Sequence, residues 1–194
     1  ELKAQGVDII GLSLGEPDFK TPKHIQQAAK DAIDEGKYFA YPPVSGYQDL
    51  REAIAKKLRE ENNIQEAKAA HIVVSVGAKH SIANTFMCIL NEGDEVVIFS
   101  PYWVSYAEII KLCGGVPVLI EGTLENNFKA SAAQLEAAIT PRTKAVIYSS
   151  PCNPTGSVFS QQELEAIANV VKKHEQVLVI ADEIYELINF TGKN

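Results

Sequence analysis

Four groups of residues that could bind a flat, charged ring each follow an apolar run of the sequence. Gly-Ala-Lys at 77–79 follows HIVVSV, and Trp103 comes shortly after DEVVIFS. Asn153 comes shortly after TKAVIYSS, and Asp182 and Tyr185 follow QVLVIA. In order, these groups offer a helix N-terminus, a large aromatic ring, an amide, and an acid with a phenol. Together they predict a pocket for a phosphorylated, cationic heteroaromatic compound.

Each group taken alone also has a simple structural explanation. Gly77 is acceptable as the N-cap of a helix, and a single tryptophan such as Trp103 is usually a core or interface residue. Asn153 lies in Asn-Pro-Thr-Gly, which is typical of a turn, and Asp182 could cap the segment that follows it. The functional interpretation depends on their shared position, because ligands of open parallel sheets bind outside the carboxyl ends of the strands.

The elements that would position these groups are alternating strands and helices. Near-continuous runs of Val and Ile predict strands at 71–76, 94–100, 116–121, 143–149 and 176–181. Such runs are typical of strands that are buried on both faces. Capping boxes from Ser131 to Gln134 and from Ser160 to Glu163 mark the starts of two of the helices between them. We therefore predict an α/β fold, a three-layer open and mainly parallel sheet with helices on both faces.

The composition excludes several classes of protein. The net charge of −7 argues against a general nucleic-acid binder, and no apolar run is long enough to predict a membrane-spanning helix. The three cysteines are far apart and show no Cys/His spacing of a metal site. We expect a reduced, cytoplasmic protein without a bound metal.

The chain resembles the class I pyridoxal-phosphate-dependent aminotransferases of fold type I, especially the aspartate aminotransferases common in bacteria. The resemblance covers nearly the whole chain in order, and SPYWVSY with NPTG is its most specific part. The other matching stretches are GLSLGEPDFKTP, YPPVSGYQDLREAI, SVGAKHSI and ADEIYE.

This resemblance implies a role for each group. Gly77, Ala78 and Lys79 would bind the phosphate of pyridoxal 5'-phosphate through backbone N–H groups, and Trp103 would stack on its ring. Asn153 and Tyr185 would donate hydrogen bonds to the phenolic oxygen of the ring. Asp182 would pair with the pyridine nitrogen and favour its protonated form, which makes the cofactor an electron sink.

The resemblance also implies roles for residues nearer the N-terminus. Gly15, together with Trp103 and Asn153, would contribute to the substrate site. Tyr41 resembles the tyrosine that reaches the cofactor phosphate of the neighbouring subunit in a homodimer, although Tyr38 is an alternative. Residues 1–40 would contribute to a small domain and the entrance of the active site. Residues 41–194 would form part of the large, cofactor-binding domain.

The catalytic residue of the family is a lysine that forms a Schiff base, and we expect it beyond Asn194. Lys193 lacks the serine-rich context that precedes this lysine in the family, so it is not assigned and no catalytic residue is predicted within the chain. The arginine that binds the substrate α-carboxylate would lie beyond the end as well. We therefore expect these residues to be a portion of a longer enzyme that could not transfer an amino group alone.

The resemblance leaves alternatives open for the function. The first expectation is transfer of an amino group from an amino acid, L-aspartate, to the 2-oxo acid 2-oxoglutarate. An aromatic or kynurenine-type donor is the second. A third is a ligand-sensing domain of a transcriptional regulator. A nicotinamide-binding domain is disfavoured, because no GxGxxG motif follows any predicted strand.

Overall fold

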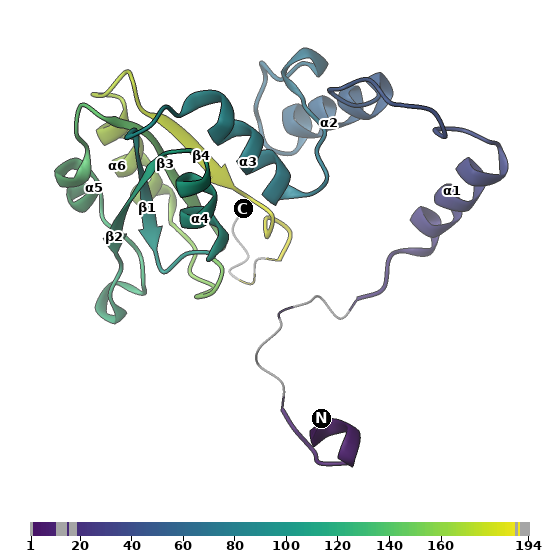
Figure 1. The fold of residues 1–194 in the computed structure, drawn as a ribbon, viewed down its shortest axis with the longest axis horizontal. Helices are drawn as coiled ribbons and strands as arrows, with labels where there is room; N and C mark the ends of the chain where they lie inside the picture. The colour runs from purple at the N-terminus through teal and green to yellow at the C-terminus, as the bar shows by residue number, and fades with distance from the viewer. Residues whose placement is uncertain (1, 11–14, 16–18, 189, 191–194) are drawn as a thin grey trace. The chain divides into compact units, whose positions relative to one another are not determined.

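The computed structural model describes residues 2–10, 15, 19–188 and 190, and the chain divides into two units, 1–44 and 45–194 (Figure 1). The first unit contains the short 3-10 helix η1 (Leu2–Gln5) and the helix α1 (Lys23–Asp34). Neither helix has a buried residue. All four described strands lie in the second unit.

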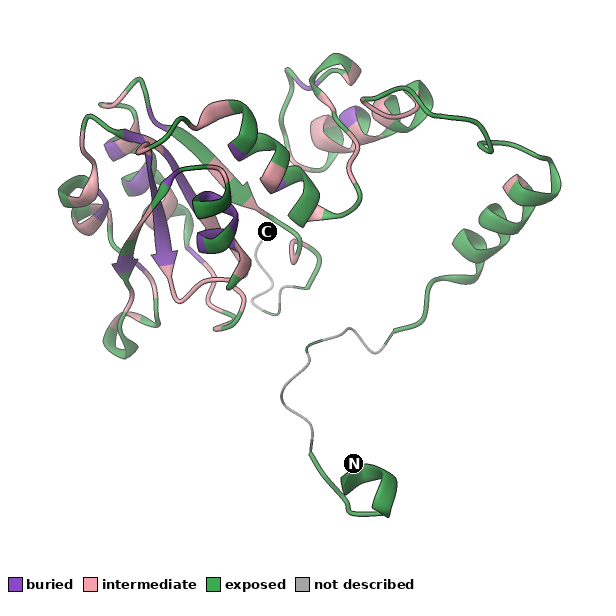
Figure 2. Ribbon diagram, viewed as in Figure 1, coloured by how far each residue is buried: buried purple, intermediate pink, exposed green. Residues whose placement is uncertain are grey.

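A four-stranded parallel sheet forms the centre of the second unit (Figure 1). Its strands are β1 (Glu95–Ser100), β2 (Val116–Glu121), β3 (Thr143–Ser149) and β4 (Leu178–Asp182), in the spatial order β2-β1-β3-β4. All three pairs of neighbouring strands are parallel. The two central strands are almost entirely buried (Figure 2), as expected for apolar strands that are covered on both faces.

Helices cover both faces of this sheet. The helices α3 (Ala78–Ile89) and α4 (Ser105–Leu112) pack on one face, where Ile82, Phe86 and Ile110 contact the strands. The helices α5 (Ala132–Ala138) and α6 (Gln161–Val171) pack on the other face, through Leu135 and Ile167. The remaining elements are α2 (Gln48–Glu60), η2 (Ala69–His71) and η3 (Leu124–Asn126). The predicted three-layer α/β fold is confirmed.

Both predicted capping boxes are present. The side chains of Ser131 and Ser160 accept hydrogen bonds from the backbone N–H groups of Gln134 and Glu163, at the starts of α5 and α6. None of the helices in the described part of the chain combines the length and the hydropathy that a membrane span needs.

The strand predicted at 71–76 is absent from the sheet, so this prediction is wrong. The segment begins with the end of η2 and continues without regular structure to Gly77. The backbone of Ile72 is extended, but the N–H of Val74 donates to the carbonyl of Ser45 and not to a strand. Val73 and Val76 are exposed. An apolar run has the propensity for a strand, but it also needs a neighbouring strand, and none of the described strands pairs with this segment.

An ion pair holds the start of β1, at the amino ends of the strands. The predicted ligand site lies at their carboxyl ends. The carboxylate of Glu95 is buried and accepts hydrogen bonds from Nε and Nη2 of Arg142, at 2.9 and 2.6 Å. The hydroxyl of Thr140 donates to its other oxygen. These bonds, first that of Thr140 and then those of Arg142, hold the pKa of Glu95 below its ordinary value of 4.5.

We predict that Glu95→Gln lowers the free energy of unfolding of the full-length protein by about 1–3 kcal/mol at neutral pH, because charge-assisted bonds to a buried group are lost. The lowered pKa means that the ionised form stabilises the folded state. The contribution is fully present above the ordinary pKa of 4.5 and is lost as the pH falls through the lowered folded-state value.

Urea denaturation of wild type and variant at several pH values measures this difference. Glu136→Gln is the control, because Glu136 pairs with Lys173 at an exposed site and such pairs contribute little. A Glu95→Gln protein as stable as the wild type at neutral pH would contradict the assignment.

Candidate active site

The turn before α3 presents backbone N–H groups at a helix N-terminus. Gly77 is the N-cap, with φ +82° and ψ 164°, and its carbonyl accepts hydrogen bonds from the amides of His80 and Ser81. The amides of Ala78 and Lys79 have no acceptor among the residues that the structure describes. The first N–H groups of a helix have no intrahelical partner and lie at its positive end, where phosphate groups bind.

The indole of Trp103 lies beside this turn. It is half-buried and packs against the core between α3, α4 and the sheet. The ammonium group of Lys79 lies 4.9 Å from the centroid of the indole, a cation–π contact that joins the start of α3 to Trp103. The ring of Tyr106 meets the indole edge-on, with the centroids 5.6 Å apart.

The carboxylate of Asp182 ends β4 and faces α4. Its Oδ2 accepts a hydrogen bond of 2.6 Å from the hydroxyl of Tyr106, and its Oδ1 accepts one of 3.2 Å from the N–H of Ile184. The side chain of Tyr106 is buried, with 1% of its surface exposed. Burial and then the bond to Asp182 raise the pKa of Tyr106 far above its ordinary value of 10.0. The phenol therefore remains protonated and keeps donating to the carboxylate.

The turn after β3 places Asn153 beside Tyr185. The amide Nδ2 of Asn153 donates to the hydroxyl oxygen of Tyr185 at 3.2 Å, and its backbone N–H donates to Oγ of Ser149 at 3.4 Å. Ser149 lies opposite Asp182 in the register of β3 and β4. The carbonyl of Cys152 accepts a 2.7 Å hydrogen bond from Gly156, which closes the turn.

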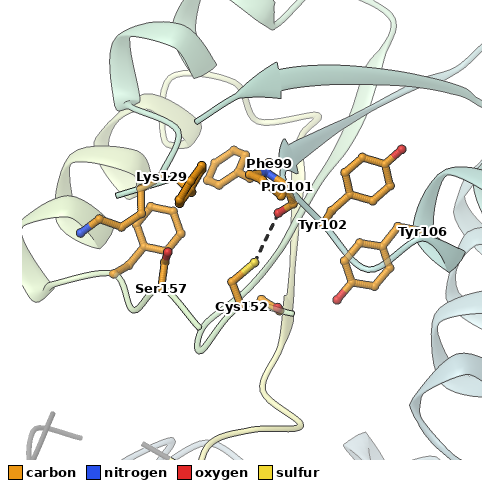
Figure 3. Close-up of a pocket in the computed structure, with 10 residues that line it drawn as sticks. Phe99, Pro101, Tyr102, Tyr106, Lys129, Cys152 and Ser157 are labelled. Carbon is orange, nitrogen blue, oxygen red and sulfur yellow. Dashed lines mark hydrogen bonds between the residues drawn. The ribbon is translucent and has the colours of Figure 1, made fainter. Parts of the chain in front are cut away.

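A small pocket lies next to these residues, at the carboxyl ends of β1 and β3 (Figure 3). Tyr106 and Ser149 line it, whereas Trp103, Asn153 and Asp182 are not among its lining residues. The side chain of Cys152 points toward Pro101 in Figure 3, and its thiol donates to the carbonyl of Pro101 at 3.3 Å. The remaining lining residues are Phe99, Tyr102, Phe128, Lys129, Ser157 and Phe159.

A chain of side-chain contacts therefore connects the predicted residues of the second unit. Lys79 contacts Trp103, which contacts Tyr106, and Tyr106 donates to Asp182. Asn153 and Tyr185 form the second, directly bonded pair, and Ser149 lies between this pair and Asp182.

Two further predicted site residues belong to the first unit. Gly15 and Tyr41 are exposed residues of the first unit, and Lys193 lies outside the described residues. Tyr106 and Ser149 were missed by the sequence analysis. No local signal separates Tyr106 from a core residue, because its partner Asp182 lies 76 positions further along the chain.

The family model for aminotransferase class I and II matches residues 7–193. The chain belongs to this family. It is 52% identical over 192 residues to an aspartate aminotransferase of Bacillus sp. (strain YM-2). The aligned region covers 99% of this chain and 48% of that protein. It is 45% identical over 194 residues to an aspartate/prephenate aminotransferase of Thermus thermophilus, covering 100% of this chain and 50% of that protein.

Solved structures of aminotransferases have the same fold. An aspartate aminotransferase from Thermus thermophilus with maleate superposes with a TM-score of 0.94 at 43% identity, over 100% of this chain and 50% of that one. An aromatic aminotransferase from Pyrococcus horikoshii OT3 gives 0.91 at 40% identity, over 99% of this chain and 51% of that one. The chain spans about half the length of the curated relatives that it matches.

We predict that Gly77→Ala destabilises the cofactor-free, full-length protein by about 1–3 kcal/mol, because its φ of +82° with an extended ψ is a conformation that is nearly restricted to glycine. Apart from the chain neighbours of Gly77, no atom of the described residues lies within 4 Å of the added methyl group, so we attribute the effect to backbone strain. Urea denaturation measures it. An unchanged midpoint and slope would mean that the turn has another conformation in solution.

Proposed function

We propose that the full-length protein is a pyridoxal-phosphate-dependent aminotransferase that transfers the amino group of L-aspartate to 2-oxoglutarate. The observation that supports it most directly is the position of Asp182. In a member of this family, an acid at the carboxyl end of a parallel strand is connected by contacts to an indole, and an amide–phenol pair lies beside it.

The residues present fit this cofactor. Each oxygen of Asp182 accepts one hydrogen bond from a described residue, and a carboxylate oxygen has room for a second. A protonated ring nitrogen could therefore be held as well. The amides of Ala78 and Lys79, which lack an acceptor within the described part of the chain, suit a phosphate group. When bound, the cofactor would supply a ring that accepts the electrons released at the substrate α-carbon.

The chain's own residues would bind and orient this ring. Asp182 would hold a proton on the ring nitrogen, because an opposite charge in contact favours the charged form of a base. Trp103 would cover one face of the ring, and Asn153 with Tyr185 would hold its phenolic oxygen. The amides of Ala78 and Lys79, with Gly77 before them, would fix the phosphate and so the position of the whole ring.

The first unit would contribute Gly15 to the substrate α-carboxylate and Tyr41 to the cofactor phosphate of the partner subunit in a homodimer. The family resemblance supports both assignments. A cytoplasmic location completes the proposal, and the three free cysteines Cys88, Cys113 and Cys152 are consistent with a reducing compartment.

A panel of amino donors tests the proposed substrate. We expect the full-length enzyme, loaded with the cofactor, to show its highest kcat/KM with L-aspartate and 2-oxoglutarate, and a lower one with phenylalanine and kynurenine. Prephenate belongs in the panel as an acceptor, because the relative in Thermus thermophilus is named an aspartate/prephenate aminotransferase. Cofactor binding without transfer from any donor would contradict the proposal and favour a ligand-sensing role.

We predict that Asp182→Asn in the full-length enzyme lowers kcat by roughly 100-fold or more, because a preorganised charge that acts on the reacting group is lost. Cofactor binding should be retained in part, since the phosphate and stacking contacts remain. Steady-state kinetics with L-aspartate and equilibrium dialysis of the cofactor measure the two effects.

The matched control is Glu183→Gln, which removes the neighbouring, exposed carboxylate. We expect this variant to keep the kcat of the wild type. Unchanged turnover in Asp182→Asn would refute the role assigned to Asp182.

A further inference from the structure

Among the residues that the structure describes, Tyr106 is the one whose side chain contacts the indole of Trp103 and also hydrogen-bonds to Asp182. Its ring meets the indole edge-on, and its hydroxyl donates to Oδ2 of Asp182 at 2.6 Å. The side chain is buried to 1% exposure in the core between α3, α4 and the sheet. A buried hydrogen bond to a carboxylate is stronger than one between neutral groups.

We propose that Tyr106 is a positioning residue for Asp182, a role that rests on the proposed function. Its hydroxyl fixes the plane of the carboxylate, and its ring supports the edge of the indole. One side chain thereby sets where the acid lies relative to the aromatic face that would cover the cofactor ring.

The local structure makes this arrangement rigid. Tyr106 lies in the first turn of α4, and its backbone N–H donates to the carbonyl of Trp103 at 3.0 Å. Tyr102 stacks on its ring at 6.4 Å between the centroids. The second oxygen of Asp182 is held by the N–H of Ile184. The carboxylate is therefore fixed at both oxygens, from α4 on one side and from its own chain on the other.

Removal of the hydroxyl alone separates positioning from packing. Tyr106→Phe keeps the aromatic contacts and removes the bond to Oδ2 of Asp182, while the hydrogen bond from the N–H of Ile184 to Oδ1 remains. The control is Tyr148→Phe, the same chemical change on β3, where the ring stacks on Phe99 in the core of the opposite face. Both variants are made in the full-length enzyme and compared with the wild type.

In the half-reaction with L-aspartate, we expect Tyr106→Phe to lower the maximal rate roughly 10-fold, the effect of losing one hydrogen bond to a charged group. The L-aspartate concentration at half-maximal rate should change by less than about twofold, because substrate contacts are unaltered. Equilibrium dialysis of the cofactor-free enzyme should give a dissociation constant for pyridoxal 5'-phosphate that is several-fold higher. Tyr148→Phe should change none of these quantities.

The possible outcomes distinguish this inference from the proposed function. If Tyr106→Phe keeps the wild-type rate and cofactor affinity while Asp182→Asn is slow, the positioning role is overturned. The proposed function then remains intact. A wild-type enzyme that transfers no amino group would overturn the proposed function itself. If Tyr106→Phe does not fold, Tyr106→4-fluorophenylalanine fills the volume of the hydroxyl without donating, and the same losses are expected from it.

Discussion

The parallel pairing of β3 with β4 is the constraint on which the candidate site depends. Their register places Ser149 opposite Asp182, so the two strands end at the same level. The chain after β3 then turns through Asn153, and the chain after β4 turns through Tyr185, which lets these residues meet although they are 32 positions apart. Because side chains alternate along a strand, a shift of the register by one residue would turn Asp182 to the other face.

The packing of the helices decides which face the site occupies. Ile180, two residues before Asp182, packs against the core that contains α3 and α4, so Asp182 projects toward the same face. Both helices begin near the carboxyl ends of the strands. They bring the indole of Trp103 and the amides of Ala78 and Lys79, which have no acceptor among the described residues. The acid and its surroundings thus come from a single layer of the fold, while α5 and α6 support the sheet from behind.

Much of this arrangement was predictable from the sequence, because the signals are local. The apolar runs of β1 and β3, the two capping boxes, and the position of Asp182 after QVLVIA all depend on residues within one element. The strand predicted at 71–76 failed because pairing depends on a distant partner, which the run itself does not reveal. Tyr106 was missed for a related reason: its hydrogen bond to Asp182 spans 76 positions, and a tyrosine on an apolar helix face is indistinguishable from a core residue in one sequence.

The position of β4 at the edge of the described sheet determines which interactions fix the acid. Leu178 and Val179 on this strand are about half exposed, whereas the residues of β1 are buried. Asp182 is nevertheless held by groups on the covered face of the sheet and in its own chain. These are the hydroxyl of Tyr106 from α4 and the N–H of Ile184 just after β4. The described contacts that orient the carboxylate come from residues 45–194. The strength of its interaction with a charged ring depends in addition on how much water reaches this edge, because the attraction between opposite charges increases as the surroundings become less polar. On the proposed function, Tyr106 and Ile184 would orient Asp182 toward the cofactor. Exclusion of water from β4 would strengthen the attraction between Asp182 and the ring.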